Sequence, residues 1–98
     1  MKRGTTPTHT YAVPFDTAGI AEARVIYSQQ GRTVLVKTDD DLTMEKNVIT
    51  VRLTQEDTFR FSPDRVDIQL RVKFPDGTVL ASDIRTVPVE RCLEEVVM

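Results

Sequence analysis

The fold is determined above all by one stretch, Val66-Asp67-Ile68-Gln69-Leu70-Arg71-Val72-Lys73-Phe74. Every even position in it is apolar, and every odd position is polar or charged. An extended strand places such alternating residues on one face, whereas a helix would spread the five apolar side chains around its circumference. The pattern therefore predicts a β-strand with one buried face and one solvated face.

The residues that follow predict a hairpin. Pro75-Asp76-Gly77 is a strong turn signal, because proline presets φ at the first turn position and glycine accepts positive φ. We expect the chain to return as a strand over residues 78–87. The apolar parity of this strand changes along its length, since Leu80 and Ile84 are even whereas Val79, Ala81 and Val87 are odd. A β-bulge or a change of sheet near Ala81-Ser82-Asp83 would reconcile the two halves.

Shorter extended patterns fill the rest of the chain. The sequence predicts strands over residues 9–13, 23–28, 32–38 and 47–53, with a turn at Gln30-Gly31. Thr54-Gln55-Glu56-Asp57 resembles a capping box and predicts a single helical turn. Residues 89–98 carry apolar side chains at helical intervals and predict one or two turns that dock on the domain. The expected fold class is all-β: one immunoglobulin-like antiparallel β-sandwich of about seven strands over residues 1–98, with a flexible arm over residues 1–8 and a short C-terminal helical turn.

Composition and charge disfavour several classes of binding partner. The formal net charge is −2 and the basic residues are scattered, which disfavours a nucleic-acid partner. The longest apolar runs have three residues, whereas a membrane-spanning helix needs about 20, so no membrane partner is expected. The first nine residues contain no apolar run, so no secretory signal is expected, and a single cysteine, Cys92, suits a reducing compartment. These observations favour a cytoplasmic location.

No residue pattern indicates catalysis, a metal or a cofactor. His9 is the only histidine and is expected to be an exposed side chain of the polar arm, and Cys92 is expected to be a small apolar filler. The Asp39-Asp40-Asp41 run lacks the alternating ligands and the glycine of a calcium loop, so a solvated hairpin loop is expected there. Asp83 has no histidine nearby in the sequence and gives no support for a hydrolytic triad. We therefore predict no catalytic, metal-binding or cofactor-binding residues, and the sequence leaves the binding residues unknown.

Two groups of side chains bear on binding. Tyr27 and Phe74 occupy apolar-parity positions and are expected in the core. The other aromatic residues, which are the only candidates for a carbohydrate platform, are Tyr11, Phe15, Phe59 and Phe61. The three apolar residues Val96-Val97-Met98 either dock on the core of the domain or act as an apolar peg for another subunit.

Parts of the sequence resemble known proteins. The segments concerned are Met1–Thr10, Val13–Asp16, Leu53–Thr58 and Asp76–Ile84. Together they resemble a group of small uncharacterised Firmicutes proteins of prophage type. The hairpin is also similar to the immunoglobulin-like N-terminal domain of phage baseplate upper proteins, and residues 53–58 look like the helical turn before strand F of immunoglobulin variable domains, although the chain has no cysteine pair and no tryptophan. The resemblance implies a module of virion or tail assembly, which would be virion-associated, and it transfers no functional residue.

Two hypotheses of function remain. The first is a non-enzymatic structural or protein-interaction module of phage or prophage origin, acting through a protein partner or self-association at its strand edges, its arm or its C-terminal residues. The alternative is a carbohydrate- or small-ligand-binding β-sandwich module, which would require exposed aromatic side chains.

Overall fold

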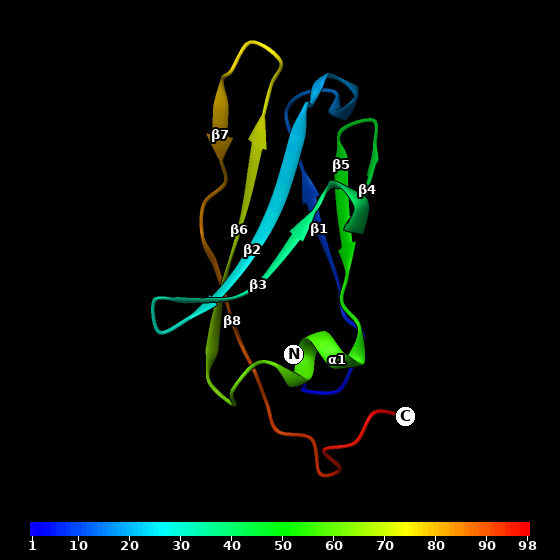
Figure 1. The fold of residues 1–98 in the computed structure, drawn as a ribbon, viewed down its shortest axis with the longest axis vertical. Helices are drawn as coiled ribbons and strands as arrows, with labels where there is room; N and C mark the ends of the chain where they lie inside the picture. Colours follow the sequence, from blue (N-terminus) through cyan, green and yellow to red (C-terminus); the bar gives the residue numbers. More distant parts are fainter.

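Two antiparallel sheets face each other in an elongated sandwich with principal extents of 46 × 27 × 17 Å (Figure 1). The computed structural model describes all 98 residues. The strands are β1 (Thr8–Ala12), β2 (Glu22–Gln29), β3 (Arg32–Thr38), β4 (Leu42–Glu45), β5 (Val48–Arg52), β6 (Arg65–Lys73), β7 (Val79–Ala81) and β8 (Arg85–Pro88). The helical elements are the 3₁₀ turns η1 (Thr17–Gly19) and η2 (Asp39–Asp41) and the short helix α1 (Gln55–Phe59).

The strand order is that of an immunoglobulin-like sandwich. The small sheet has the order β1-β5-β4, and the large sheet has the order β3-β2-β6, with β7 and β8 both paired to the same side of β6. These orders correspond to strands B-E-D and C′-C-F-G of immunoglobulin domains. The predicted fold class is confirmed, and the predicted hairpin forms the F–G pair.

The predicted irregularity in the return strand is a β-bulge. Ala81 lies opposite Arg71 and Arg85 lies opposite Ile68, so residues 82–84 face only residues 69 and 70. Ser82 stabilises the bulge, because its amide donates to the Leu70 carbonyl at 2.8 Å and its hydroxyl accepts from the Leu70 amide at 3.0 Å. The bulge lets one chain segment remain beside β6 while its side chains change face.

The even residues of β6 form the centre of the core, as their alternation predicts. Val66, Ile68, Leu70 and Val72 are all buried, and they face the inward side chains of the small sheet. Phe74 lies just past the strand and is partly buried, and its ring packs edge-on against Phe15 at a centroid distance of 5.1 Å. The remaining buried apolar residues of the core are Tyr11, Val13, Ala23, Val25, Tyr27, Leu35, Ile49, Val51, Leu53, Phe61 and Val89.

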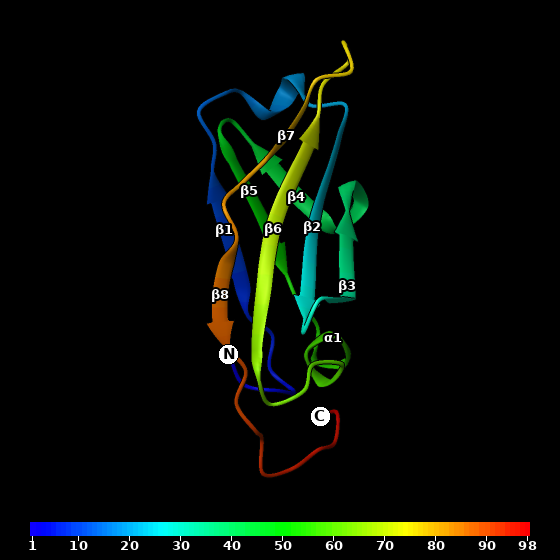
Figure 2. The same ribbon diagram turned by 90° about the vertical axis from the view of Figure 1, so that its left-hand side faces the viewer.

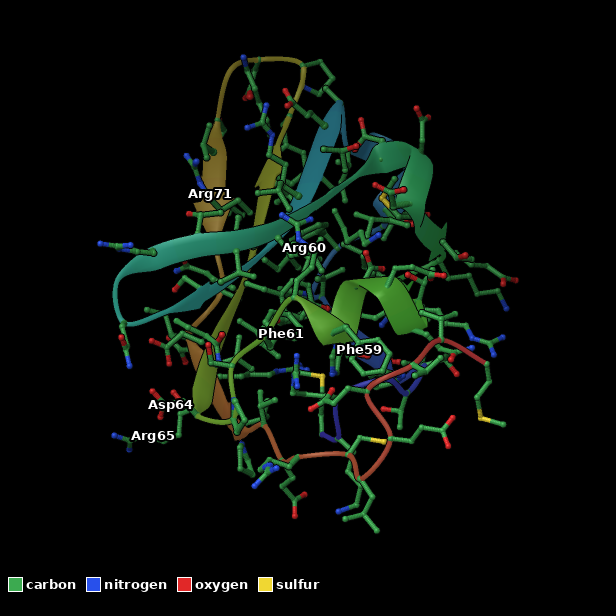
Figure 3. The ribbon with its side chains drawn as sticks, turned by 60° about the horizontal axis from the view of Figure 1, so that its bottom comes forward. Phe59, Arg60, Phe61, Asp64, Arg65 and Arg71 are labelled. Atoms are coloured by element: carbon green, nitrogen blue, oxygen red, sulfur yellow. The ribbon has the colours of Figure 1, made fainter.

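Helix α1 carries the chain from β5 to β6 and closes one end of the sandwich. Its capping box is complete, because the Thr54 hydroxyl accepts from the Asp57 amide at 3.1 Å and the Asp57 carboxylate accepts from the Thr54 amide at 2.9 Å. Phe61 follows the helix, is fully buried and packs against Tyr27 at 5.7 Å between ring centroids. Figure 3 shows Phe59 and Phe61 around this end, with Arg71 further along the large sheet.

The two chain ends meet at the end of the sandwich that carries α1 (Figure 1). Residues 1–8, expected as a flexible arm, make defined hydrogen bonds: the Glu90 amide donates to the Met1 carbonyl at 2.8 Å, and the Arg3 amide donates to the Glu90 carbonyl at 3.0 Å. The helical turn expected within residues 89–98 is wrong, because these residues contain no helix and only bend at Leu93 and Val96. So short an isolated segment cannot repay helix nucleation without an apolar surface to pack on, and its apolar side chains remain in solvent.

Candidate functional site

One long side of the sandwich is formed by the free edges of both sheets. Strand β1 is the outer strand of the small sheet, and the β7–β8 segment is the outer part of the large sheet. Figure 2 shows β1 and β8 along the same side of the molecule, where they belong to the two facing sheets. We refer to it as the open side, because neither edge is paired along its whole length with another strand.

The hydrogen-bond pattern of β1 shows which groups face the open side. The Val13 amide donates to the Asn47 carbonyl and the Leu53 amide donates to the Pro7 carbonyl, both at 2.9 Å, so the odd residues of this segment bond to β5. In an antiparallel ladder the intervening residues point their amides and carbonyls away from the partner. The backbone groups of Thr8, Thr10 and Ala12 therefore face the open side.

Arg85 closes the lower half of the open side. From β8, its guanidinium stacks over the Tyr11 ring at 3.8 Å and donates to the Thr10 carbonyl at 2.9 Å. It thus links the large sheet to the exposed edge of the small one. Arg85 forms no ion pair in the structure, so its positive charge has no carboxylate partner. Below it, residues 1–3 cover the end of the large sheet through their parallel pairing with Glu90.

The upper half of the open side holds an apolar groove. Its volume is about 290 Å³, and eight of its ten lining residues are hydrophobic. Leu80 explains why the groove exists: it lies opposite the buried Val72 on the inner face of the sheet, yet it is 45% exposed. The small sheet ends with β1 on this side, and no further strand beyond β1 covers Leu80. The lining residues are Tyr11, Ala12, Val13, Pro14, Phe15, Leu70, Val72, Leu80, Ala81 and Ser82.

Tyr11 contributes an unsatisfied polar group to this region. Its side chain is buried, and its hydroxyl has no hydrogen-bond partner in the structure. Burial raises the pKa of Tyr11, while Arg85 and Ser82 act in the opposite direction. A buried hydroxyl without a hydrogen-bond partner costs free energy in the folded state. The groove is therefore apolar, and the one polar group of Tyr11 lies buried behind its lining.

The polar residues singled out in the sequence lie away from this groove. The prediction that His9 is an exposed side chain is wrong, since it is only half-exposed and its Nδ1 lies 2.7 Å from the hydroxyl of the buried Tyr27. The odd residues of β1 point inward, which is why the polar His9 turns toward the core. Burial, with smaller effects of Arg85 and the Met1 amino group, lowers the pKa of His9.

The acidic run and the cysteine have structural surroundings. Residues 39–41 form the 3₁₀ turn η2, where Asp39 accepts from the Ala23 amide and Asp41 accepts from the Thr38 amide at 3.1 Å. Asp83 lies in the bulge, and its carbonyl accepts from the Ser82 hydroxyl at 2.9 Å. Cys92 is half-buried and lies outside the hydrophobic core. No group of three or more His, Cys, Asp or Glu side chains is arranged to hold a metal ion.

The C-terminal apolar residues do not dock on the core of the domain. Val96, Val97 and Met98 are 60%, 45% and 99% exposed. The Met98 amide donates to the Gln55 side chain at 2.7 Å, which holds the main chain near α1 while the side chains face solvent. Of the two interpretations of these residues, docking on the chain's own core is therefore wrong.

The groove could not be named from the sequence, although one signal pointed to it. The parity change at the bulge makes Leu80 an inward residue and Val79 an outward one, and this difference is visible in the sequence. The uncovered position of Leu80 depends on the unequal widths of the sheets, which only the tertiary structure shows.

Comparisons with protein-family models, with curated proteins and with solved structures gave no match. In addition, no helix of the structure is both long enough and apolar enough to span a membrane.

Proposed function

We propose that this domain is a non-enzymatic protein-interaction module that binds an extended segment of a protein partner in the apolar groove of its open side. The observation that carries the proposal is Leu80, an inward-facing apolar side chain that the domain's own small sheet leaves 45% exposed. The backbone groups of Ala12 beside it also face the open side. An added strand would bury Leu80 and bond to these backbone groups in one step, as in β-strand addition.

The surroundings of the groove support binding over chemistry. Of its polar side chains, Ser82 already bonds through its hydroxyl to Leu70 and Asp83, which are contacts of the bulge. The resemblance to prophage-type proteins and to baseplate domains favours a partner in a virion or tail assembly, encountered in the cytoplasm during assembly.

The alternative function, carbohydrate binding, would require a platform of exposed aromatic side chains, and the structure does not present one. Tyr11 and Phe61 are buried, and Phe15 and Phe59 are only half-exposed. Phe15 packs against Phe74, and Phe59 lies under the Arg3 guanidinium at 5.5 Å. Because two of the four rings are buried and the other two are partly covered by Phe74 and Arg3, we favour a protein partner over a carbohydrate.

A peptide selection tests the proposal. A library of random heptapeptides displayed on phage would be panned on the wild-type domain, and bound peptides would be measured by fluorescence anisotropy. We expect apolar extended peptides whose affinity falls roughly tenfold or more on Leu80→Asp, which puts a charge into the groove.

Val79→Asp is the matched control. Val79 is the preceding residue and is equally exposed at 47%, but it faces the outer side of the sheet, so this variant should bind the peptides like the wild type. Enrichment of no peptide, or equal loss on both variants, would contradict a binding role of the groove.

A further inference from the structure

We infer that the groove receives the segment Glu94–Met98 of a second copy of this chain. The inference rests on the proposed function, because it names the partner of that same groove. Three observations support it: the exposure of this segment, its match to the groove and the distance between the two within one molecule.

The segment packs against no sheet and would have to straighten to bind as a strand. Residues 91–98 belong to no helix or strand, and the chain bends at Leu93 and Val96. In an added strand alternate side chains would share a face, with Glu94, Val96 and Met98 on one side and Leu93, Glu95 and Val97 on the other. The first face combines one carboxylate with two apolar side chains that are 60% and 99% exposed.

The open side presents a row of side chains that is complementary to this face of the segment. Along β1 and just beyond it, Tyr11, Val13 and Phe15 follow at the same two-residue spacing, and all three line the groove. Arg85 lies over Tyr11 at the lower end and has no carboxylate partner. A strand laid parallel to β1 would bring Glu94 to Arg85.

The apolar side chains of the segment fit the volume of the groove. At about 290 Å³ it is roughly twice the ~150 Å³ cavity that holds one benzene molecule in another protein. It therefore accommodates two aliphatic side chains, and the face of the segment offers two, Val96 and Met98. The segment thus matches the open side in charge at its Glu94 end and in apolar volume at its Met98 end.

The segment cannot reach the groove of its own molecule. Both chain ends lie beside α1, at the opposite end of the sandwich from β7 (Figure 1). Met98 is eight residues beyond Glu90, which spans at most about 28 Å, and part of that length is consumed by the reversal of direction. Leu80 lies ten residues before Glu90 along a nearly straight edge, or about 30 Å away. The contact must therefore form between two copies.

Donor and acceptor at opposite ends define a head-to-tail assembly. Each copy would give its segment to one neighbour and accept the segment of another, which generates open chains unless the rotation closes a ring. Few contacts hold the segment in a single copy: the 44% exposed Glu95 side chain pairs with Arg3, and Met98 bonds to Gln55. They can be exchanged for the groove at low cost.

Sedimentation velocity between about 10 µM and about 1 mM tests the inference, with the full chain as the material. We expect the mean mass to rise with concentration for the wild type. Val96→Asp should remove the donor and Leu80→Asp the acceptor, each weakening association roughly tenfold or more. The controls are Leu93→Asp, on the opposite face of the segment, and Val79→Asp, on the opposite face of the sheet, and both should associate like the wild type.

Mixing the two defective variants gives the sharper result. Val96→Asp keeps a groove and Leu80→Asp keeps a segment, so an equimolar mixture should form one junction and stop at a dimer, whereas neither variant associates alone. The charge reversals Glu94→Arg and Arg85→Glu should each weaken association, and their combination in one chain should restore it.

The outcomes separate this inference from the proposed function. A wild type that remains monomeric to 1 mM, or a mixture that forms no dimer although both variants are folded by circular dichroism, would overturn the second-copy partner. If selected peptides still bind the groove and lose binding on Leu80→Asp, the proposed function survives and only the identity of the partner is wrong. If neither self-association nor peptide binding occurs, both fail.

Discussion

The ion pair between Lys37 and Asp57 ties α1 to the large sheet, and its removal should be costly. Lys37 Nζ lies 2.8 Å from Asp57 Oδ2, and the two side chains are only 15% and 13% exposed. The same carboxylate also accepts from the Thr54 amide in the capping box. Asp57→Asn preserves the shape and much of the cap, but it leaves the Lys37 ammonium largely buried without a counter-charge.

The expected loss lies between two limits. Exposed pairs contribute about 0–1 kcal/mol, whereas breaking a buried pair costs about 3–5 kcal/mol. For two groups that retain a little solvent contact we expect Asp57→Asn to lower the free energy of unfolding by about 2–3 kcal/mol. At about 4–8 °C per kcal/mol for a domain of this size, the melting temperature should fall by about 10–20 °C.

Urea unfolding followed by far-UV circular dichroism measures the effect, because the chain has no tryptophan to report by fluorescence. Lys37→Met in the Asp57→Asn background should recover stability, since it removes the uncompensated charge, and the double-mutant cycle should give a coupling above about 1 kcal/mol. A loss below about 0.5 kcal/mol for Asp57→Asn, or a coupling near zero, would refute the assignment of stability to this pair.

The stability of the protein at low pH provides a second test of the role of Asp57. Burial alone would raise the pKa of Asp57, but the hydrogen bonds from Lys37 and Thr54 outweigh it and hold the pKa below 3.8. A carboxyl group whose pKa is lowered in the folded state stabilises the protein above the unfolded value, and this contribution is lost as the pH falls through the folded value. The Asp57→Asn variant should therefore lose less stability than the wild type below about pH 4.

Three further predictions concern single groups. The pKa of His9 is lowered from 6.5 in the folded state, so the unfolded chain takes up a proton at a higher pH than the folded protein. The wild type should therefore lose stability as the pH falls below 6.5. In urea titrations at pH 7.5 and 5.5, His9→Gln should not show this loss. Gly4 and Gly31 share a φ of +76°, but only at Gly4 would a Cβ meet an aromatic ring, at 2.5 Å. Gly4→Ala should therefore lower the free energy of unfolding by about 1–2 kcal/mol more than Gly31→Ala, as measured by urea unfolding. Tyr11→Phe removes a hydroxyl that has no partner and should be neutral or stabilising by up to about 1 kcal/mol, whereas Tyr27→Phe removes a bonded hydroxyl and should cost about 1 kcal/mol in thermal melts.

Much of the fold follows from local patterns. The alternation over residues 66–74 predicted β6, its buried face and its hairpin partner, because strand period and core burial act on the same side chains. The parity change predicted the bulge at Ser82 for the same reason. Thr54 and Asp57 predicted α1, since a capping box requires only residues within one turn.

The errors arose where local and tertiary signals diverge. Strand β4 was not predicted, because its four residues carry only two apolar side chains and follow the acidic turn η2. Residues 89–98 have apolar spacing that suits either a helix or a strand, and without a surface to pack on no helix forms. The orientation of His9 is set by the register of β1 with β5, so a polar side chain in a polar segment was placed on the wrong face.

The two long sides of the sandwich differ in a way that bears on the groove. On the side formed by β3 and β4, the chain closes its own edges: η2 contacts β2, β3 and β4, and Lys37 on β3 pairs with Asp57 beyond the end of β5. On the open side, the only side chain that bridges the sheets in a comparable way is Arg85, and above it an inward apolar residue remains uncovered. A polar residue in place of Leu80 would remove the exposed apolar surface, because the exposed 45% of this side chain gains nothing from being apolar in a free monomer. An apolar side chain at an inward position is stabilising once an added strand covers it. The contrast between the two sides therefore favours a partner at the groove over a defect of packing.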